Sequence, residues 1–500
     1  MNSLRHDGVL VPSKYVGRGL TVEIKGEVVK LDDDQEEMAV AWAKKIGTPY
    51  VDDKVFAENF HKSFSEKLRR QVLPGEVDYS EVLESVQRER DWKANRPLEE
   101  KKKQAAERAV SRSDNKGRYG WATVDGENIE IGNYTVEPNS IFMGRGQHPK
   151  RGTWKEGPRE EDIKLNLSPD APRPEGNWKE IVWEPNSIWI AGWKDKLQGG
   201  MRYVWPSDTS LLKQKKDIEK FEKARKLKKK LGVIKAHIEA NLTAKDLKRR
   251  KVATVCYLID CLKFRVGTEK DDDDADTVGA STLRSEHVCF NGDGLVTFNF
   301  LGKDSIPLSV TAELPRQVVE NLKEFTQRAG GESLFEGVTS GHVNDFFKEV
   351  MEGLSAKVFR TLCATEAVRD KLASEHVGSK DPDYVKRQAA LMANLEAAIV
   401  CNHKRAISRT WAQNLQRKKD RLAKLRGQKK QNKVAVEKLR LQIEAQEKTR
   451  DYSLGTSLKN YIDPRIYLDW GRRVGYDWKR YYPATLQRKF SWIERGGQES

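Results

Sequence analysis

The segment that most restricts the fold of this chain lies at residues 407–450, where a narrow apolar stripe meets a heavily cationic surface. It has no Pro and a single Gly, Gly427, and it holds 14 Lys and Arg residues against four Asp and Glu residues. Its apolar residues recur at helical spacing in two sets, which are Trp411, Leu415, Leu422 and Leu425, then Val436, Leu439 and Ile443. This pattern predicts two helices that double back near Gly427–Asn432 as an antiparallel coiled coil. Because so narrow a stripe buries little apolar surface, we expect the pair to project into solvent.

Positive charge is not confined to that segment. Over the whole chain, 91 Lys and Arg residues exceed 75 Asp and Glu residues, which gives a net charge of +16. A second basic stretch, residues 213–230, has ten cationic and three acidic residues. Such an excess repels itself unless a partner offsets it, and a polyphosphate is the commonest partner of this kind. The alternative from charge alone is a merely soluble basic protein, in which residues 407–450 are an ordinary solvated hairpin.

The first part of the chain changes character at residue 119. A chain of 500 residues is too long to pack around one compact hydrophobic core, so about two to four domains are expected. Before residue 119, strand-like runs at Leu20–Ile24 and Val28–Leu31 precede helical patterns at Gln35–Ile46 and near Tyr79–Val110. Residues 119–205 are rich in Gly, Pro, Trp and alternating apolar residues, which predicts strands and tight turns.

The remainder of the chain is predicted to be mainly helical. A basic helix is expected from Thr209 to Leu231, and the basic residues at Lys245–Lys251 begin an apolar helix. Residues 281–306 predict a β-hairpin around the turn tetrapeptide Asn-Gly-Asp-Gly at 291–294. Helical patterns then run from about Leu314 to His403, and the tail after residue 450 is aromatic and helical.

Several classes of function are excluded by what the sequence lacks. Its five cysteines form no Cys-x-x-Cys pair, which argues against a disulfide scaffold or a zinc ribbon and favours a reducing compartment. No run approaches the roughly 18 apolar residues of a membrane span, and the N-terminus has no apolar signal-peptide core. Motifs for nucleotide, zinc-protease and serine-hydrolase sites are absent. The acidic run Asp271–Asp274 is expected to be a solvated loop rather than a divalent cation site.

What remains is a set of single polar residues in apolar surroundings. Each alone has a plain structural explanation: an Arg is usually in a salt bridge, a His at a helix end is a cap, and a Tyr packs with its hydroxyl bonded. The five residues are Arg265 in LKFRVGTEK, Lys303 in FNFLGKDS, Arg360 in AKVFRTL, His403 in IVCNHKR and Tyr461 in SLKNYIDPR.

Together, in the order Arg, Lys, Arg, His, Tyr, these residues resemble the pattern of type IB DNA topoisomerases and of the related tyrosine recombinases. The flanking text is similar to that of eukaryotic-like type IB enzymes, in a compact archaeal-type form. Upstream, GRGQHPK from Gly144 and WKE from Trp178 extend the resemblance to nearly the whole chain. The other matching segments are RVGTEK from Arg265, ADTVG from Ala275, FLGKDS from Phe300, MEGLSAKVFRT from Met351, CNHKR from Cys401 and LGTSLKNYIDPR from Leu454.

The resemblance implies that positive side chains, with no metal or other cofactor, support a transfer of DNA phosphate to tyrosine. Arg265 and Arg360 would bind the non-bridging oxygens, since a guanidinium grips two oxygens and keeps its charge. His403 would donate a further hydrogen bond, Lys303 would protonate the leaving 5′ oxygen, and Tyr461 would form a 3′-phosphotyrosine. The implied DNA-binding residues are Arg145, Lys150, Arg202, Tyr203, Asp304 and Asn460, of which the last two are similar to residues near the site of camptothecin-type poisons.

The implied fold class is α+β and multidomain, a bilobed DNA clamp. Residues 1–205 would form a mixed α/β cap, 206–406 a mainly helical, recombinase-like catalytic lobe with a β-hairpin, 407–450 the coiled-coil linker and 451–500 the tyrosine-bearing C-terminal domain. The implied partner is double-stranded, supercoiled DNA, bound by a monomer without nucleotide or membrane. The lack of a long charged N-terminal tail favours the cytoplasm or nucleoid of an archaeal-type cell over a nucleus.

Two alternatives remain open from the sequence. A tyrosine recombinase or integrase uses the same five roles, but it usually has a His three residues before the second Arg, where this chain has Lys357. A non-catalytic DNA-clamping protein would share the basic surface without the chemistry.

Overall fold

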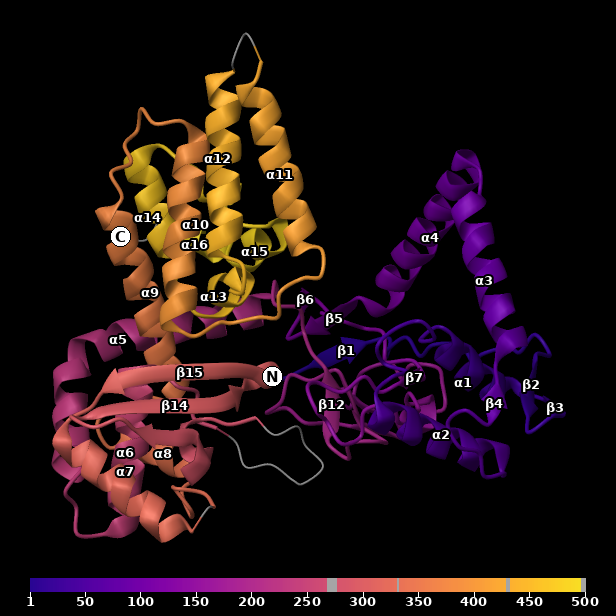
Figure 1. Ribbon diagram of the computed structural model, residues 1–500, viewed down its shortest axis with the longest axis horizontal. Coiled ribbons are helices and arrows are strands. Elements are labelled where there is room, and N and C mark those ends of the chain that lie inside the picture. Colours follow the sequence, from indigo (N-terminus) through magenta and orange to yellow (C-terminus); the bar gives the residue numbers. More distant parts are fainter. Residues whose placement is uncertain (268–276, 331, 429–431, 496–500) are drawn as a thin grey trace. The chain divides into compact units, whose positions relative to one another are not determined.

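The computed structural model describes residues 1–267, 277–330, 332–428 and 432–495, and it has a mixed α/β fold that is about half helical (Figure 1). The chain divides into two compact units, with the boundary between Lys213 and Gln214. No helix in the described residues is long and apolar enough to cross a membrane.

The first unit combines small sheets with helices. Its sheets have the strand orders β1-β5-β6, β3-β2-β4, β10-β9-β11-β12 and β7-β8. The strands are β1 (Leu4–His6), β2 (Thr21–Ile24), β3 (Glu27–Lys30), β4 (Val77–Asp78), β5 (Trp121–Val124), β6 (Glu127–Glu130), β7 (Ser140–Ile141), β8 (Trp154–Lys155), β9 (Lys164–Asn166), β10 (Glu180–Val182), β11 (Ala191–Lys194) and β12 (Met201–Val204). The helices are α1 (Asp33–Ala43), α2 (Lys54–Leu68), α3 (Ser80–Asn95), α4 (Leu98–Tyr119) and the 3₁₀ turn η1 (Glu160–Asp162).

The prediction of one charged helix near Tyr79–Val110 is wrong, because the structure has two helices there. Helix α3 ends at Asn95 and α4 begins at Leu98. Between them Arg96 is extended, at φ −57° and ψ 140°, and Pro97 has no N–H to continue a helical hydrogen-bond ladder. Pro97 therefore separates α3 from α4, although charged residues continue on both sides of it.

The second unit is built mainly from helices around one sheet. Its helices are α5 (Leu211–Asn241), which crosses the boundary, then α6 (Leu247–Leu262), α7 (Arg316–Ala329), α8 (Ser340–Lys348), α9 (Ala356–Ser374), α10 (Asp383–Val400), α11 (Trp411–Arg426), α12 (Lys433–Lys448), α13 (Leu454–Asn460), α14 (Arg465–Val474), α15 (Ala484–Lys489) and α16 (Trp492–Arg495). The strands are β13 (Val288–Phe290), β14 (Leu295–Gly302) and β15 (Ile306–Glu313), and the 3₁₀ turns are η2 (Ala280–Thr282), η3 (Ser285–His287), η4 (Lys303–Ser305) and η5 (Trp478–Arg480).

The predicted hairpin is present, but it belongs to a larger sheet. Strands β13 and β14 pair in an antiparallel ladder that places Val288 opposite Phe298. Strand β15, which the sequence analysis did not predict, pairs with β14 along its whole length. The longer hairpin is therefore β14–β15 (Figure 1). Lys303 lies in the turn η4 between these strands.

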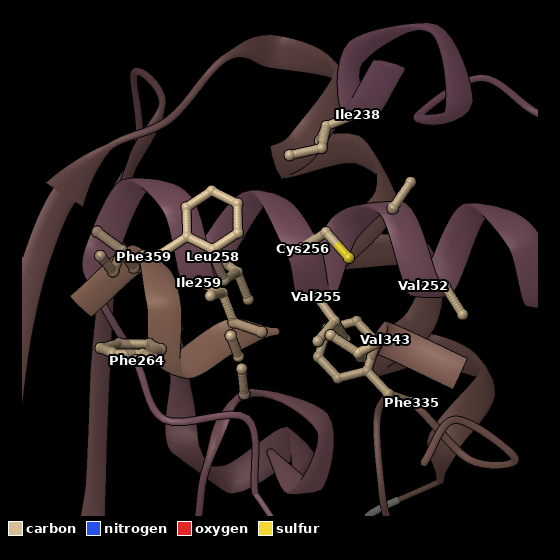
Figure 2. Close-up of a cluster of buried hydrophobic side chains, with 14 of the residues drawn as sticks. Ile238, Val252, Val255, Cys256, Leu258, Ile259, Phe264, Phe335, Val343 and Phe359 are labelled. Carbon is tan, nitrogen blue, oxygen red and sulfur yellow. The ribbon is translucent and has the colours of Figure 1, made fainter. Parts of the chain in front are cut away.

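Helix α6 is the centre of the main hydrophobic core of the second unit. Val252, Val255, Cys256 and Ile259 are buried and recur at the spacing of one helical face. Figure 2 shows this face among side chains from several other elements. They include Ile238 of α5, Val343 of α8, Phe359 of α9, Phe264 and Phe335. The core thus ties α6, at whose end the candidate site begins, to the rest of the unit.

Helices α11 and α12 form the expected pair and lie side by side (Figure 1). Trp411 Nε1 donates to the carbonyl of Gln446 at 3.3 Å, so the start of α11 meets the end of α12 and the helices are antiparallel. Their contact is narrow, with a buried cluster of Leu415, Leu439 and Ile443. The predicted bend falls partly on residues 429–431, which lie outside the described residues.

The chain that enters this helix pair is joined to the chain that leaves it. Lys404 and Tyr452 form an antiparallel bridge. Arg405 N donates to the carbonyl of Asp451 at 2.8 Å, and Ser453 N donates to the carbonyl of His403 at 2.7 Å. Residues 403–405 and 451–453 therefore close the base of the pair.

A buried carboxylate, Asp195, holds the loop regions of the first unit together. It accepts hydrogen bonds from Lys155 Nζ at 2.7 Å and from Arg202 Nε at 3.1 Å. It also accepts from the backbone N–H groups of Leu197 and Gln198. Burial by itself would raise the pKa of Asp195, but these hydrogen bonds outweigh it and lower the pKa to about 2.

Asp195→Asn is expected to destabilise the first unit by about 3 kcal/mol at pH 7, because it leaves the buried Lys155 with one fewer anionic partner. The Asp195 contribution is full above its unfolded pKa of 3.8 and is lost as the pH falls through about 2. Urea unfolding followed by tryptophan fluorescence should therefore show a gap in unfolding free energy between wild type and variant that narrows as the pH falls from about 4 to about 2. Glu99→Gln breaks the exposed Lys102–Glu99 pair and is the control, with an expected loss of less than about 1 kcal/mol. Equal losses in the two variants would contradict the role of Asp195.

Candidate active site

Arg265 is placed by the packing of its neighbour Phe264. Helix α6 ends at Leu262, the next residue Lys263 adopts the left-handed conformation, and Phe264 then turns into the core. There the Phe264 ring packs edge-on against Phe298 and Phe300 of β14, with centroids 5.5 and 5.2 Å away. This contact fixes the segment that carries Arg265 against the sheet.

A tight backbone contact completes the placement of Arg265. Its carbonyl accepts a hydrogen bond from Ala280 N at 2.8 Å, and the carbonyl of Val266 accepts from Ser281 N at 2.7 Å. Gly267 and Gly279 face each other there, and a Cβ on Gly279 would lie 2.4 Å from the Gly267 backbone. Only glycine at position 279 permits so close an approach.

Arg360 is a buried cation held by carbonyl groups rather than carboxylates. It lies on α9 and is 4% exposed. Nη1 donates to the carbonyl of Lys263 at 2.7 Å, and Nη2 donates to the carbonyl of Cys401 at 2.6 Å. Within the described residues, its buried Nε has no hydrogen-bond partner. Burial lowers the pKa of Arg360, and the nearby Arg265 lowers it further. In the described part of the chain, the charge thus has no anionic partner, and this favours the binding of an anion.

His403 lies between Arg360 and helix α13. It follows the end of α10, and its backbone N donates to the carbonyl of Ala398 at 2.8 Å. Its Nε2 lies 3.0 Å from Arg360 Nη2, and its Nδ1 lies 2.6 Å from Ser457 Oγ. Burial, together with the positive charges of Arg360 and Arg265, lowers the pKa of His403 to about 3. The ring is therefore neutral at physiological pH.

Tyr461 lies at the end of α13 and points among these groups. Its hydroxyl accepts a hydrogen bond from Arg265 Nη1 at 3.3 Å. Its ring lies 4.9 Å from the His403 ring, and the Arg360 guanidinium carbon is 5.2 Å from its centre. Thr365 Oγ1 of α9 donates to the Tyr461 carbonyl at 3.3 Å, which holds the backbone. The phenol oxygen is thus in direct reach of one guanidinium and beside a second.

Lys303 shares a cavity with three of these residues. Arg265, Arg360 and His403 line the cavity together with Lys303. Lys303 is exposed in the turn η4, and the first residues of β15 line the same cavity. The structure therefore brings all five residues of the predicted set to one region of the second unit.

The predicted DNA-binding residues are distributed over both units. Arg145, Lys150, Arg202 and Tyr203 belong to the first unit, where Lys150 Nζ donates to the Leu197 carbonyl at 3.3 Å. Leu197 N and Arg202 Nε both donate to Asp195. The loop that carries Lys150, which bonds Leu197, therefore lies beside the turn before β12.

The remaining two predicted residues lie beside the catalytic set in sequence. Asn460 precedes Tyr461, and its Nδ2 donates to the Thr456 carbonyl at 3.1 Å. Asp304 lies in η4 by its backbone, and its side chain is outside the described part.

Sequence reasoning missed the groups that support the five residues. They are the carbonyls of Lys263 and Cys401 and the hydroxyls of Ser457 and Thr365. No pattern marks a carbonyl or a single hydroxyl as a partner of residues 40 or more positions away, so these contacts need the fold. Among the described residues, no His, Cys, Asp or Glu group could hold a metal ion, and Asp271–Asp274 fall outside those residues.

The arrangement is suited to nucleophilic attack on a bound anion. A phenol hydroxyl beside two guanidinium groups can approach a phosphorus atom whose oxygens those groups neutralise. The buried, carboxylate-free Arg360 strengthens the electrostatic attraction, since its field is screened little by water.

Three family models match successive parts of the chain. Residues 1–206 match "Eukaryotic DNA topoisomerase I, DNA binding fragment" and residues 209–436 match "Eukaryotic DNA topoisomerase I, catalytic core". Residues 433–499 match "C-terminal topoisomerase domain".

Curated relatives resemble the chain over nearly its whole length. It is 32% identical to DNA topoisomerase 1 beta of Arabidopsis thaliana over 98% of this chain and 58% of the relative. It is 31% identical to DNA topoisomerase 1 of Drosophila melanogaster over 100% and 54%, respectively. With DNA topoisomerase 1 of Homo sapiens, the identity is 32% over 98% of this chain and 70% of the relative. The chain thus spans little more than half of the plant and insect proteins, but it belongs to the eukaryotic DNA topoisomerase I family.

Proposed function

We propose that this chain is a type IB DNA topoisomerase, which relaxes positive and negative supercoils without ATP or a metal ion. It would cleave one DNA strand, let that strand rotate about the other, and reseal it. The observation that carries the proposal is the position of the Tyr461 phenol, 3.3 Å from the Arg265 guanidinium and beside the buried Arg360. The family membership and the net charge of +16 also support it.

The proposed chemistry is a transesterification. The Tyr461 oxygen forms a bond to the phosphorus while the bond from phosphorus to the 5′ oxygen breaks, which leaves a 3′-phosphotyrosine and a 5′-hydroxyl. Arg265 and Arg360 bind the non-bridging oxygens, and His403 donates one more hydrogen bond to them. Lys303 gives its proton to the departing 5′ oxygen. Because one phosphodiester replaces another, resealing runs the same steps backwards without an external energy source.

The proposed architecture is a clamp around double-stranded DNA. Residues 1–205 would form the cap and 206–406 the catalytic lobe, a division supported by the compact units that separate after Lys213. Residues 407–450 would be the linker and 451–500 the tyrosine-bearing domain. The DNA contacts would include Arg145, Lys150, Arg202, Tyr203, Asp304 and Asn460. The protein would act as a DNA-associated monomer, and an archaeal-type cell rather than a nucleus stays a prediction.

Tyr461→Phe should abolish relaxation and the covalent DNA complex, with a loss of about 10⁴-fold or more, because it removes the nucleophilic oxygen and little else. Plasmid relaxation and denaturing-gel trapping of the covalent complex measure this, while duplex affinity should stay within about threefold. Tyr482→Phe is the matched control, since the buried Tyr482 hydroxyl has no partner in the described residues. It should relax plasmids like the wild type. Relaxation by Tyr461→Phe would eliminate the proposed nucleophile and favour a different enzyme mechanism.

Relaxation should proceed in EDTA without ATP on both positively and negatively supercoiled plasmids that lack any recombination site. The physical reason is that fixed cations at the site neutralise the phosphorane charge. Agarose gels of topoisomer distributions provide the measurement. A requirement for magnesium, or action on one sign of supercoil alone, would contradict the type IB assignment, and a requirement for a specific site would favour a recombinase.

Lys303→Ala should slow cleavage of an ordinary duplex by roughly 10²- to 10⁴-fold, the usual contribution of a general acid. With a duplex whose 5′ bridging oxygen is replaced by sulfur, the same variant should cleave nearly as fast as wild type, because a thiolate leaves without a proton. Single-turnover cleavage rates on the two duplexes separate proton donation from phosphate binding. An equal defect on both duplexes would assign Lys303 to binding instead. Lys323→Ala, a cation on α7 stacked near Phe290, is the control and should leave both rates unchanged.

A further inference from the structure

Helix α13, which ends just before Tyr461, is anchored on His403 at two points. At its start, Ser453 N donates to the His403 carbonyl at 2.7 Å. One turn later, the Ser457 hydroxyl lies 2.6 Å from His403 Nδ1. Ser457 is fully buried, and its carbonyl accepts a hydrogen bond from Tyr461 N at 2.9 Å. The same serine therefore contacts the imidazole through its side chain and the proposed nucleophile through its backbone.

The contacts of His403 define which ring nitrogen carries the proton. Arg360 Nη2 lies 3.0 Å from Nε2, and a guanidinium can only donate, so Nε2 must accept. A neutral imidazole has one N–H, which must then be on Nδ1 and be donated to Ser457 Oγ. In this state, His403 has no proton on Nε2, the nitrogen that contacts Arg360, and both residues line the cavity together with Arg265 and Lys303.

The proposed reaction needs the opposite arrangement. A hydrogen bond from His403 to a phosphate oxygen requires a proton on Nε2, because Nδ1 is occupied by Ser457. A neutral ring with its proton on Nε2 has an acceptor at Nδ1, which must find a donor to avoid a buried unpaired lone pair. A serine hydroxyl can both donate and accept, so Ser457 can serve either form of the ring.

We propose that Ser457 is a positioning residue that selects the tautomer of His403, and this inference rests on the proposed function. In the empty site its oxygen accepts from Nδ1–H. When phosphate takes over the Arg360 donors, a solvent proton adds at Nε2 and the Nδ1 proton returns to solvent, so the ring stays neutral. The Ser457 hydroxyl then donates to Nδ1, and Nε2–H donates to the phosphate oxygen.

The tautomer can be measured without any enzymatic turnover. In protein labelled with ¹⁵N-histidine, the His403 nitrogen shifts should report Nδ1–H in the free protein, with no titration between pH 5 and pH 8 because its pKa is lowered to about 3. In the complex of Tyr461→Phe with a DNA duplex, the shifts should change to Nε2–H. An unchanged tautomer in that complex would overturn the inference while leaving the proposed nucleophile untouched.

Kinetics give a second, independent test. Ser457→Ala should slow single-turnover cleavage roughly 10- to 100-fold with DNA affinity nearly unchanged, and Ser457→Thr should restore most of the rate because it keeps the hydroxyl. In a His403→Ala background, Ser457→Ala should have little further effect, since the residue acts through the ring. If Ser457→Ala slowed cleavage as much in the His403→Ala background as in the wild type, the proposal would be contradicted.

Thr365→Val is the matched control for this cycle. It also removes a buried hydroxyl beside Tyr461, but that hydroxyl contacts the Tyr461 carbonyl and Asp463 N rather than His403. Its effect should therefore add to that of His403→Ala. A wild-type protein that forms no covalent DNA complex would instead reject the proposed function, an outcome distinct from an unchanged tautomer. If Thr365→Val and Ser457→Ala behaved alike toward His403→Ala, Ser457 would have only a structural role.

Discussion

The arrangement of the candidate site depends on the burial of the Arg360 guanidinium, which has no carboxylate partner among the residues that the structure describes. Its charge is stabilised by the carbonyls of Lys263 and Cys401, which belong to the ends of α6 and α10. The C-terminal end of a helix carries partial negative charge, so two such ends can hold one cation without cancelling it. A carboxylate would neutralise the guanidinium and remove its attraction for phosphate. The same contacts bring Arg265, which follows α6, and His403, which follows α10, to within reach of one ligand.

Much of the fold follows from the sequence because local patterns determine local structure. The helical periodicity of residues 247–262, the Asn-Gly-Asp-Gly turn and the two apolar sets of residues 407–450 each predict an element that the structure contains. The errors have physical causes. Pro97 divides one charged stretch into two helices. Strand β15 was missed although its side chains alternate between half-buried and exposed, because Pro307 counts against a strand and the backbone partner β14 is supplied only by the folded sheet.

For the candidate site too, the sequence predicted some residues and could not predict others. The order and flanking text of Arg265, Lys303, Arg360, His403 and Tyr461 mark them as a set, and the structure gathers them in one region. Their supporting groups could not be predicted, because backbone carbonyls have no sequence signature. Ser457 illustrates this limit. Nothing in the sequence distinguishes it from other serines, and its role can be inferred only from the 2.6 Å contact of its hydroxyl with an imidazole 54 positions away. Whether a residue is present can be inferred from the sequence, whereas what holds it requires coordinates.

The closed base of the helix pair has a consequence for the family's diversity. Because residues 403–405 and 451–453 are bonded directly to each other, the junction itself constrains the chain on both sides of the site. The pair is also held to the unit through α12, which packs against α10, where Lys438 lies over the Tyr384 ring. Turns added in step to both helices at the far end, beyond the contact of α12 with α10, would leave the hydrogen bonds of the junction in place. Its length is therefore a variable that natural selection can adjust independently of the chemistry.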